Sequence, residues 1–122
     1  MTKTAEQITR AYAVLDHIET NPDKHDQSRF AYPHYEILSA DMIMTMCVSH
    51  ACFAGWTVLL DGQKVEDGFY LAGTAHGVAD EAADLLGLHD HEKQALFYDA
   101  RDLDAVRKAV FEIFGPRPDG AL

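Results

Sequence analysis

The residues best suited to chemistry lie close together in the stretch MCVSHAC, positions 46–52. This stretch contains Cys47 and Cys52, the only two cysteines of the chain, with His50 between them. If a helix begins at Ser49, Cys47 lies just before it and Cys52 in its first turn, where both sulfurs could share an ion with His50. A thiol at this end of a helix also has a lowered pKa, because it lies near the positive end of the helix dipole. Three interpretations follow: a metal site, a redox pair and a reactive thiol.

The spacing of the cysteines argues against each interpretation. C-x4-C is neither the C-x2-C of common zinc sites nor the motif of thioredoxin-like proteins, and a zinc site would need two of seven histidines. A nucleophile at Cys52 beside His50 or His34 would be poorly accessible in a helix. Free cysteine is among the residue types most often buried, so packing is the first interpretation. A small metal- or ligand-binding site of Cys47, Cys52 and a nearby histidine, with His50 as a candidate, is the alternative.

A helix must precede this stretch. Thr4 and Gln7 fit a capping box, and Pro22 predicts the end of the helix, with Asn21 as a left-handed cap. Between them, apolar residues recur at three- and four-residue steps, as on one helix face: Ile8, Ala11, Tyr12, Leu15 and Ile18.

Four more helices are expected. Ser49 is a good N-cap for a helix that ends at Asp61-Gly62, inside which Gly55 would permit the close approach of another backbone. The last third contains three short helices: one capped by Thr74 and stopped by Gly87-Leu88, one over residues 89–100, and one capped by Asp102 and stopped by Gly115-Pro116. Extended structure is favoured at residues 43–48, and a short strand at 69–71. We therefore expect a mainly α, compact single domain of about five helices over residues 1–115, with room for one short two-stranded β element, and a flexible tail at 116–122.

Charge and composition exclude several functions. The chain has 122 residues, 20 acidic and 10 basic, and a net charge of −10, which repels nucleic-acid backbones. No apolar run could span a bilayer, and the N-terminus lacks the apolar core of a signal peptide. We expect a cytoplasmic protein without membrane contact, a monomer or small homo-oligomer. An acidic surface suits a basic protein partner.

Motifs of catalysis are also missing. The sequence has no P-loop, no H-E-x-x-H and no G-x-S-x-G, so neither an enzyme nor a cofactor is expected. Residues 89–92 could be interpreted as a metal site, but a helix start is the favoured interpretation, with Glu92 in the first turn near the positive end of the helix dipole. His25, Asp26 and Gln27 could bind a polar ligand, although bonds to the loop backbone are the simpler reading. Aromatic and methionine side chains are numerous, as at protein interfaces, with burial in the core favoured for most of them: Phe30, Tyr32, Tyr35, Met42, Met44, Met46, Phe69 and Tyr70.

The run CVSHACFAGW resembles the C-G-T-x-x-C-x-A-G-W signature of small, functionally uncharacterised proteins of bacteria and their phages. The run at 21–30, NPDKHDQSRF, resembles the P-x-x-x-D-Q-x-x-W element that often precedes that signature. The run at 83–98 is similar to the leucine-glycine-leucine turn and helix that follow it. Departures from the pattern are Val48 for glycine, Ser49 for threonine, Phe30 for tryptophan and His89 for a capping threonine.

The resemblance implies a fold and a context, and no activity. It favours a structural role for Ser49, Cys52, Gly55 and Trp56 together, as the buried start of a central helix. Together with the missing catalytic motifs and the acidic charge, the occurrence of the resembled family in phages favours a non-enzymatic accessory protein of phage origin that acts by binding a host or phage protein.

Overall fold

The computed structural model describes residues 3–27, 30–32, 37–45, 49–74 and 76–118. Within these ranges the chain forms six α-helices and one short antiparallel hairpin, so the expected mainly α single domain is confirmed. In chain order the elements are α1 (Ala5–Thr20), η1 (Pro22–Lys24), α2 (Ala40–Thr45), α3 (Phe53–Leu60), β1 (Val65–Glu66), β2 (Tyr70–Leu71), α4 (Val78–Leu86), α5 (Asp90–Lys93), the π-helical η2 (Gln94–Asp99) and α6 (Leu103–Phe114).

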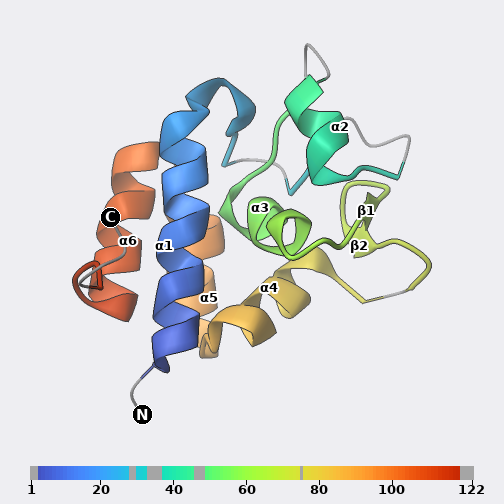
Figure 1. The fold of residues 1–122 in the computed structure, drawn as a ribbon. Helices are drawn as coiled ribbons and strands as arrows, with labels where there is room; N and C mark the ends of the chain where they lie inside the picture. The colour runs from blue at the N-terminus through green and yellow to red at the C-terminus, as the bar shows by residue number, and fades with distance from the viewer. Residues whose placement is uncertain (1–2, 28–29, 33–36, 46–48, 75, 119–122) are drawn as a thin grey trace.

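Helix α1 lies at the centre of the molecule. Figure 1 shows α6 packed on one side of it and α3 and α4 on the other, with the β1–β2 hairpin beyond α3. The largest fully buried side chains, Trp56 and Phe53, both belong to α3. The core is therefore built around α3, which is buried along nearly its whole length.

The start of α1 is as the sequence predicts. Thr4 Oγ1 accepts a hydrogen bond from the Gln7 backbone at 3.1 Å, and Gln7 Oε1 accepts one from the Thr4 backbone at 2.9 Å. At the other end, Asn21 is not left-handed, because its φ is −127°. It ends the helix by donating its backbone N–H and its side-chain amide to the His17 carbonyl.

Extended structure at residues 43–48 was the wrong expectation for its first three residues, which belong to α2. Ser39 Oγ accepts the Met42 N–H at 3.3 Å, and Thr45 Oγ1 donates to the Asp41 carbonyl. These local bonds stabilise a turn of helix that buries Ile43 alone. Residues 46–48 lie outside the described residues.

Helix α3 begins three residues later than predicted. Residues 50 and 51 are extended instead, because they pair with the preceding loop: His50 exchanges two backbone hydrogen bonds with Tyr32, and Ala51 donates to the Lys24 carbonyl at 3.0 Å. The N-cap is therefore Cys52 rather than Ser49. The helix ends at Asp61, as expected.

The last third follows the predicted order with two differences. Helix α4 is capped by Gly77 instead of Thr74, whose hydroxyl accepts the His76 N–H at 3.0 Å; it ends at the left-handed Gly87, as predicted. The helix expected over 89–100 is α-helical only at its start and continues as the π-helical η2. Asp102 caps α6 as predicted, by accepting the Ala105 N–H at 2.8 Å.

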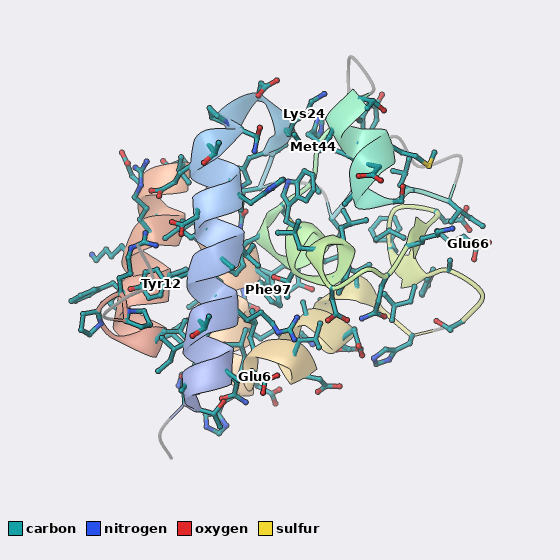
Figure 2. All side chains as sticks on the ribbon, viewed as in Figure 1. Glu6, Tyr12, Lys24, Met44, Glu66 and Phe97 are labelled. Atoms are coloured by element: carbon teal, nitrogen blue, oxygen red, sulfur yellow. The ribbon has the colours of Figure 1, made fainter. Side chains whose placement is uncertain are left out.

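Residues 116–118 of the predicted flexible tail are held on α1. Arg117 Nη1 donates to Asp16 Oδ2 at 2.8 Å, and the guanidinium lies 4.7 Å from the centre of the Tyr12 ring. Figure 2 shows Tyr12 on the side of α1 that faces α6, where its hydroxyl donates to the Gly115 carbonyl at 2.5 Å. Arg117 thus contacts α1, and the flexibility expected of residues 116–122 stays a prediction.

No helix among the described residues is long and apolar enough to cross a bilayer.

Candidate functional site

The Cys52 thiol is buried and serves as a helix cap. Its Sγ accepts the Gly55 N–H at 3.4 Å, and the side chain is 1% exposed. Burial raises the pKa of Cys52 to about 12, so the thiol stays protonated at neutral pH. A protonated, enclosed thiol is a poor nucleophile and a poor metal ligand. Cys47 lies outside the described residues.

His50 lies among groups that give it a structural role. Its ring stacks on Tyr32 with the ring centres 5.1 Å apart, and its Nε2 lies 3.3 Å from Asp26 Oδ2. The buried Ser49 hydroxyl donates to the Ile43 carbonyl at 2.5 Å. The segment before α3 is therefore fixed to the 24–32 loop and to α2.

Gly55 and Trp56 attach α3 to the same loop. A Cβ on Gly55 would stand 1.6 Å from the Phe30 carbonyl oxygen, so only glycine fits this close approach. Trp56 is fully buried, its Nε1 donates to the Lys24 carbonyl at 2.9 Å, and its ring centre is 4.3 Å from that of His17. All four residues of the signature that the resemblance singles out, Ser49, Cys52, Gly55 and Trp56, are buried.

Gln27 is a structural link: it makes the backbone bonds that the sequence favours for it, but with two helices rather than with the loop. Its Oε1 accepts the Phe53 N–H at 3.1 Å, its Nε2 donates to the Leu96 carbonyl at 2.8 Å, and His25 Nε2 lies 2.8 Å from Oε1. The amide thus joins the first turn of α3 to the π-helical segment, whose widened turn leaves that carbonyl available. Bonds to the backbone, rather than a polar ligand, occupy this side chain.

A different place on the molecule has the shape of a binding site. Between α1 and α3 lies an apolar groove of about 460 Å³. Val14 and Thr57, both buried, form its floor, and Leu60 is 42% exposed at its edge. The remaining lining residues come from α1: Ala5, Glu6, Thr9, Arg10 and Ala13.

The groove exists because of small side chains on α1. Ala5, Thr9 and Ala13 are four residues apart and so lie on one face of the helix, and all three are exposed. Two helices pack with their axes about 8–10 Å apart, so a row of small residues at the edge of the contact leaves an open channel. This spacing is visible in the sequence, but it lies outside the apolar face that predicts the helix.

One edge of the groove is acidic. Arg10 is neutralised by Asp61, with Nη1 and Oδ1 3.0 Å apart, and lies 4.0 Å from Glu6. Gln63 Nε2 then connects Asp61 Oδ2, at 2.9 Å, with Glu81 Oε2, at 3.0 Å. Figure 2 shows Glu6 near the N-terminal end of α1. Of these charged residues, Glu6 and Arg10 line the groove, and Asp61 adjoins it through Arg10. Glu81 lies farther out, beyond Gln63, so the excess of negative charge is next to the groove rather than in its lining.

A second apolar surface lies around Phe30. Its ring makes edge-to-face contacts with Phe69 and Tyr98, with ring centres 6.1 and 6.2 Å apart. Phe69 and Tyr70 are about half exposed, so the prediction that most of these side chains are buried in the core is wrong for these two. Phe30, Tyr32, Met42 and Met44 are partly buried, while Tyr35 and Met46 lie outside the described residues.

No protein-family model, curated protein or solved structure matches the chain. The resemblance of residues 47–56 to the bacterial and phage signature therefore stays a prediction.

Proposed function

We propose that this protein is a non-enzymatic binding module for another protein, and that the partner docks in the α1–α3 groove. The observation that carries the proposal is the groove itself, an open apolar hollow between two helices with Leu60 exposed at its edge. Ligand sites are concave, mostly apolar and about 300–1,000 Å³ in volume, and the groove falls in this range.

The shape of the groove favours an elongated, apolar occupant. Amphipathic helices bind by laying anchors at three- and four-residue steps into a groove between helices. Ala5, Thr9 and Ala13 form one wall along α1, Leu60 lies at the opposite edge, and Val14 and Thr57 form the floor. Apolar side chains of such a helix would be desolvated against Val14 and Leu60, which is where binding free energy is gained.

The charge of the protein indicates which polar residues the partner carries beside its apolar anchors. The protein has a net charge of −10, and the acids Glu6 and Asp61 lie beside Arg10 at the groove. A partner segment with lysine or arginine beside its apolar anchors would be steered to this surface and held in register. The occupant we propose is therefore a basic amphipathic helix of a host or phage protein, in the accessory role that the sequence resemblance implies.

Affinity selection tests this proposal without knowledge of the natural partner. A displayed library of amphipathic helical peptides, with random residues on the polar face, is selected on the immobilised protein. We expect the selected peptides to be enriched in lysine and arginine, and their affinity to fall with added salt. Selection of acidic or uncharged peptides would overturn the charge argument.

Two variants locate the binding site. Leu60→Glu places a charge in the groove, whereas Phe111→Glu makes the same change at a residue of α6 that is 58% exposed and does not line the groove. We expect the Leu60→Glu variant to bind the selected peptides at least about tenfold more weakly and the Phe111→Glu variant to bind them as the parent does. Equal affinity of the two variants would refute the groove as the docking site.

A further inference from the structure

Three side chains near the start of α4 have the spacing of metal ligands. His76, Glu81 and Asp84 each offer one donor atom, and these three atoms lie within 4.8 Å of one another. His76 Nε2 and Glu81 Oε1 are 3.2 Å apart. We propose that these residues bind one divalent transition-metal ion of the zinc and cobalt class, a site that does not depend on the α1–α3 groove.

The local fold places the donors on one side of α4. Glu81 and Asp84 are three residues apart within the helix and so share a face. His76 precedes the Gly77 cap, and its backbone is fixed on both sides, because its N–H donates to Thr74 Oγ1 at 3.0 Å and its carbonyl accepts the Leu71 N–H at 2.9 Å. The imidazole is thus directed back along the helix toward the two carboxylates.

The distances suit direct coordination. Zinc bonds to histidine nitrogen and carboxylate oxygen are about 2.0–2.2 Å long, which places neighbouring ligand atoms roughly 3.0–3.5 Å apart in tetrahedral or octahedral geometry. The separation of 3.2 Å between His76 Nε2 and Glu81 Oε1 already has this value. The Asp84 donor atom lies within 4.8 Å of both other donors, and its side chain is exposed, so a change of rotamer can bring it closer.

A contact from another segment supports the same assignment. Gln63 Nε2 donates to Glu81 Oε2 at 3.0 Å, which fixes the carboxylate and leaves Oε1 directed at His76. Hydrogen bonds of this kind to the outer oxygen orient ligating carboxylates in metal sites. Gln63 and Thr74, which bonds the backbone of His76, also line a hollow of about 320 Å³. His76 and Asp84 are themselves exposed, so solvent can supply a water as the fourth ligand.

The donor set selects the class of ion. One imidazole with two carboxylates favours zinc, cobalt and nickel, whereas calcium and magnesium prefer oxygen donors alone. Cys52 contributes nothing here, because it is enclosed in the core as the cap of α3. The site is distinct from the cysteine-based alternative that the sequence suggests.

Calorimetric titration of the full chain with zinc chloride and with cobalt chloride tests the proposal. We expect one ion per chain, and an affinity at least about tenfold lower in His76→Ala and in Asp84→Asn. His91→Ala is the matched control, because His91 is an exposed histidine whose ring stacks on His89 outside the site, and it should bind as the parent does. Circular dichroism checks that each variant is folded.

The absorption spectrum of the cobalt-loaded protein separates this site from a cysteine site. Coordination by nitrogen and oxygen gives only weak visible bands, whereas a thiolate ligand adds an intense near-ultraviolet charge-transfer band. We expect no such band. A thiolate band, unchanged affinity in His76→Ala, or the absence of saturable binding would each overturn the proposal.

Discussion

The carbonyl oxygen of Phe30 lies 1.6 Å from the position that a Cβ atom would occupy on Gly55. The loop before α2 therefore touches the backbone of α3 directly, at the level of the buried Trp56. Alanine favours helix by about 1 kcal/mol over glycine, so on propensity alone Gly55→Ala would stabilise α3. The overlap with a backbone atom cannot be relieved by a side-chain rotation. We expect the Gly55→Ala variant to lose about 1–3 kcal/mol of its free energy of unfolding, measured in urea.

Gly77→Ser is the matched control for this change. A Cβ on Gly77 has its nearest neighbour at 3.6 Å, which is ordinary contact, and serine is a better N-cap for α4 than glycine. We expect its free energy of unfolding to be unchanged or slightly raised. A similar loss in both variants would mean that the contact with Phe30 is not the cause.

The buried thiol of Cys52 should be protected from alkylation. Burial raises its pKa from the ordinary value of 9.0 to about 12, which lowers the thiolate fraction at neutral pH roughly a thousandfold. Iodoacetamide labelling, followed for the Cys52 peptide by mass spectrometry, should be at least that much slower in native buffer than in concentrated urea. Equal rates in the two conditions would show that the thiol is exposed in the folded protein. The interpretation of Cys52 as a reactive thiol would then be favoured again.

His17 should make the protein less stable in acid. Its Nε2 is buried without a hydrogen-bond partner among the described residues, and burial lowers the pKa of its ring, which lies against Trp56. The unfolded chain then binds this proton more tightly than the folded chain does. The stabilisation is present above the ordinary pKa of about 6.5 and is lost as the pH falls from there toward the lowered folded value.

Replacement of His17 isolates its part of this pH dependence. His17→Phe keeps a ring against Trp56 and removes the titrating group. Urea unfolding, followed by Trp56 fluorescence at neutral pH and at about pH 5, should show a smaller loss in the variant than in the parent. The two proteins differ only at position 17, so the comparison isolates His17. The same pH dependence in both proteins would contradict this role of His17.

Arg117 should contribute to stability although it follows the last helix. It pairs with Asp16 and covers the Tyr12 ring. Arg117→Ala should lower the free energy of unfolding by about 0.5–1 kcal/mol, the usual range of partly exposed ion pairs and cation–π contacts. The exposed Arg101 is the control, and Arg101→Ala should have no measurable effect. If Arg117→Ala also has none, the segment after α6 is not held on α1.

Local signals in the sequence predicted helix boundaries correctly where no long-range contact displaced them. The capping box of Thr4 and Gln7, the Asp102 cap and the left-handed Gly87 each predicted a helix boundary that the structure has. The close approach at Gly55 was also foreseen, although its partner was not.

Boundaries decided by long-range pairing could not be predicted. Ser49 is the better N-cap by residue type, and the backbone bonds of His50 and Ala51 with Tyr32 and Lys24 move the cap to Cys52. The same holds for η2, whose widened turn meets an amide from Gln27, sixty-nine positions earlier in the sequence.

The two proposed sites could not be predicted from the sequence either, because they too depend on contacts between segments and on helix boundaries. In the helix expected from Thr74, His76 and Glu81 would point about 140° apart, at roughly 100° per residue. They meet because α4 begins only after Gly77. The groove likewise needs the position of Leu60 against Ala5, Thr9 and Ala13, which no local pattern supplies.

Chemical-shift mapping by NMR tests the docking site most directly. The isotope-labelled protein is titrated with the tightest basic amphipathic peptide from the selection. We expect the largest shift changes at groove residues of both helices, Thr9, Ala13 and Leu60, with Phe111 unchanged. Changes centred on Phe30, Phe69 and Tyr98 would contradict the groove as the docking site and assign binding to the aromatic surface.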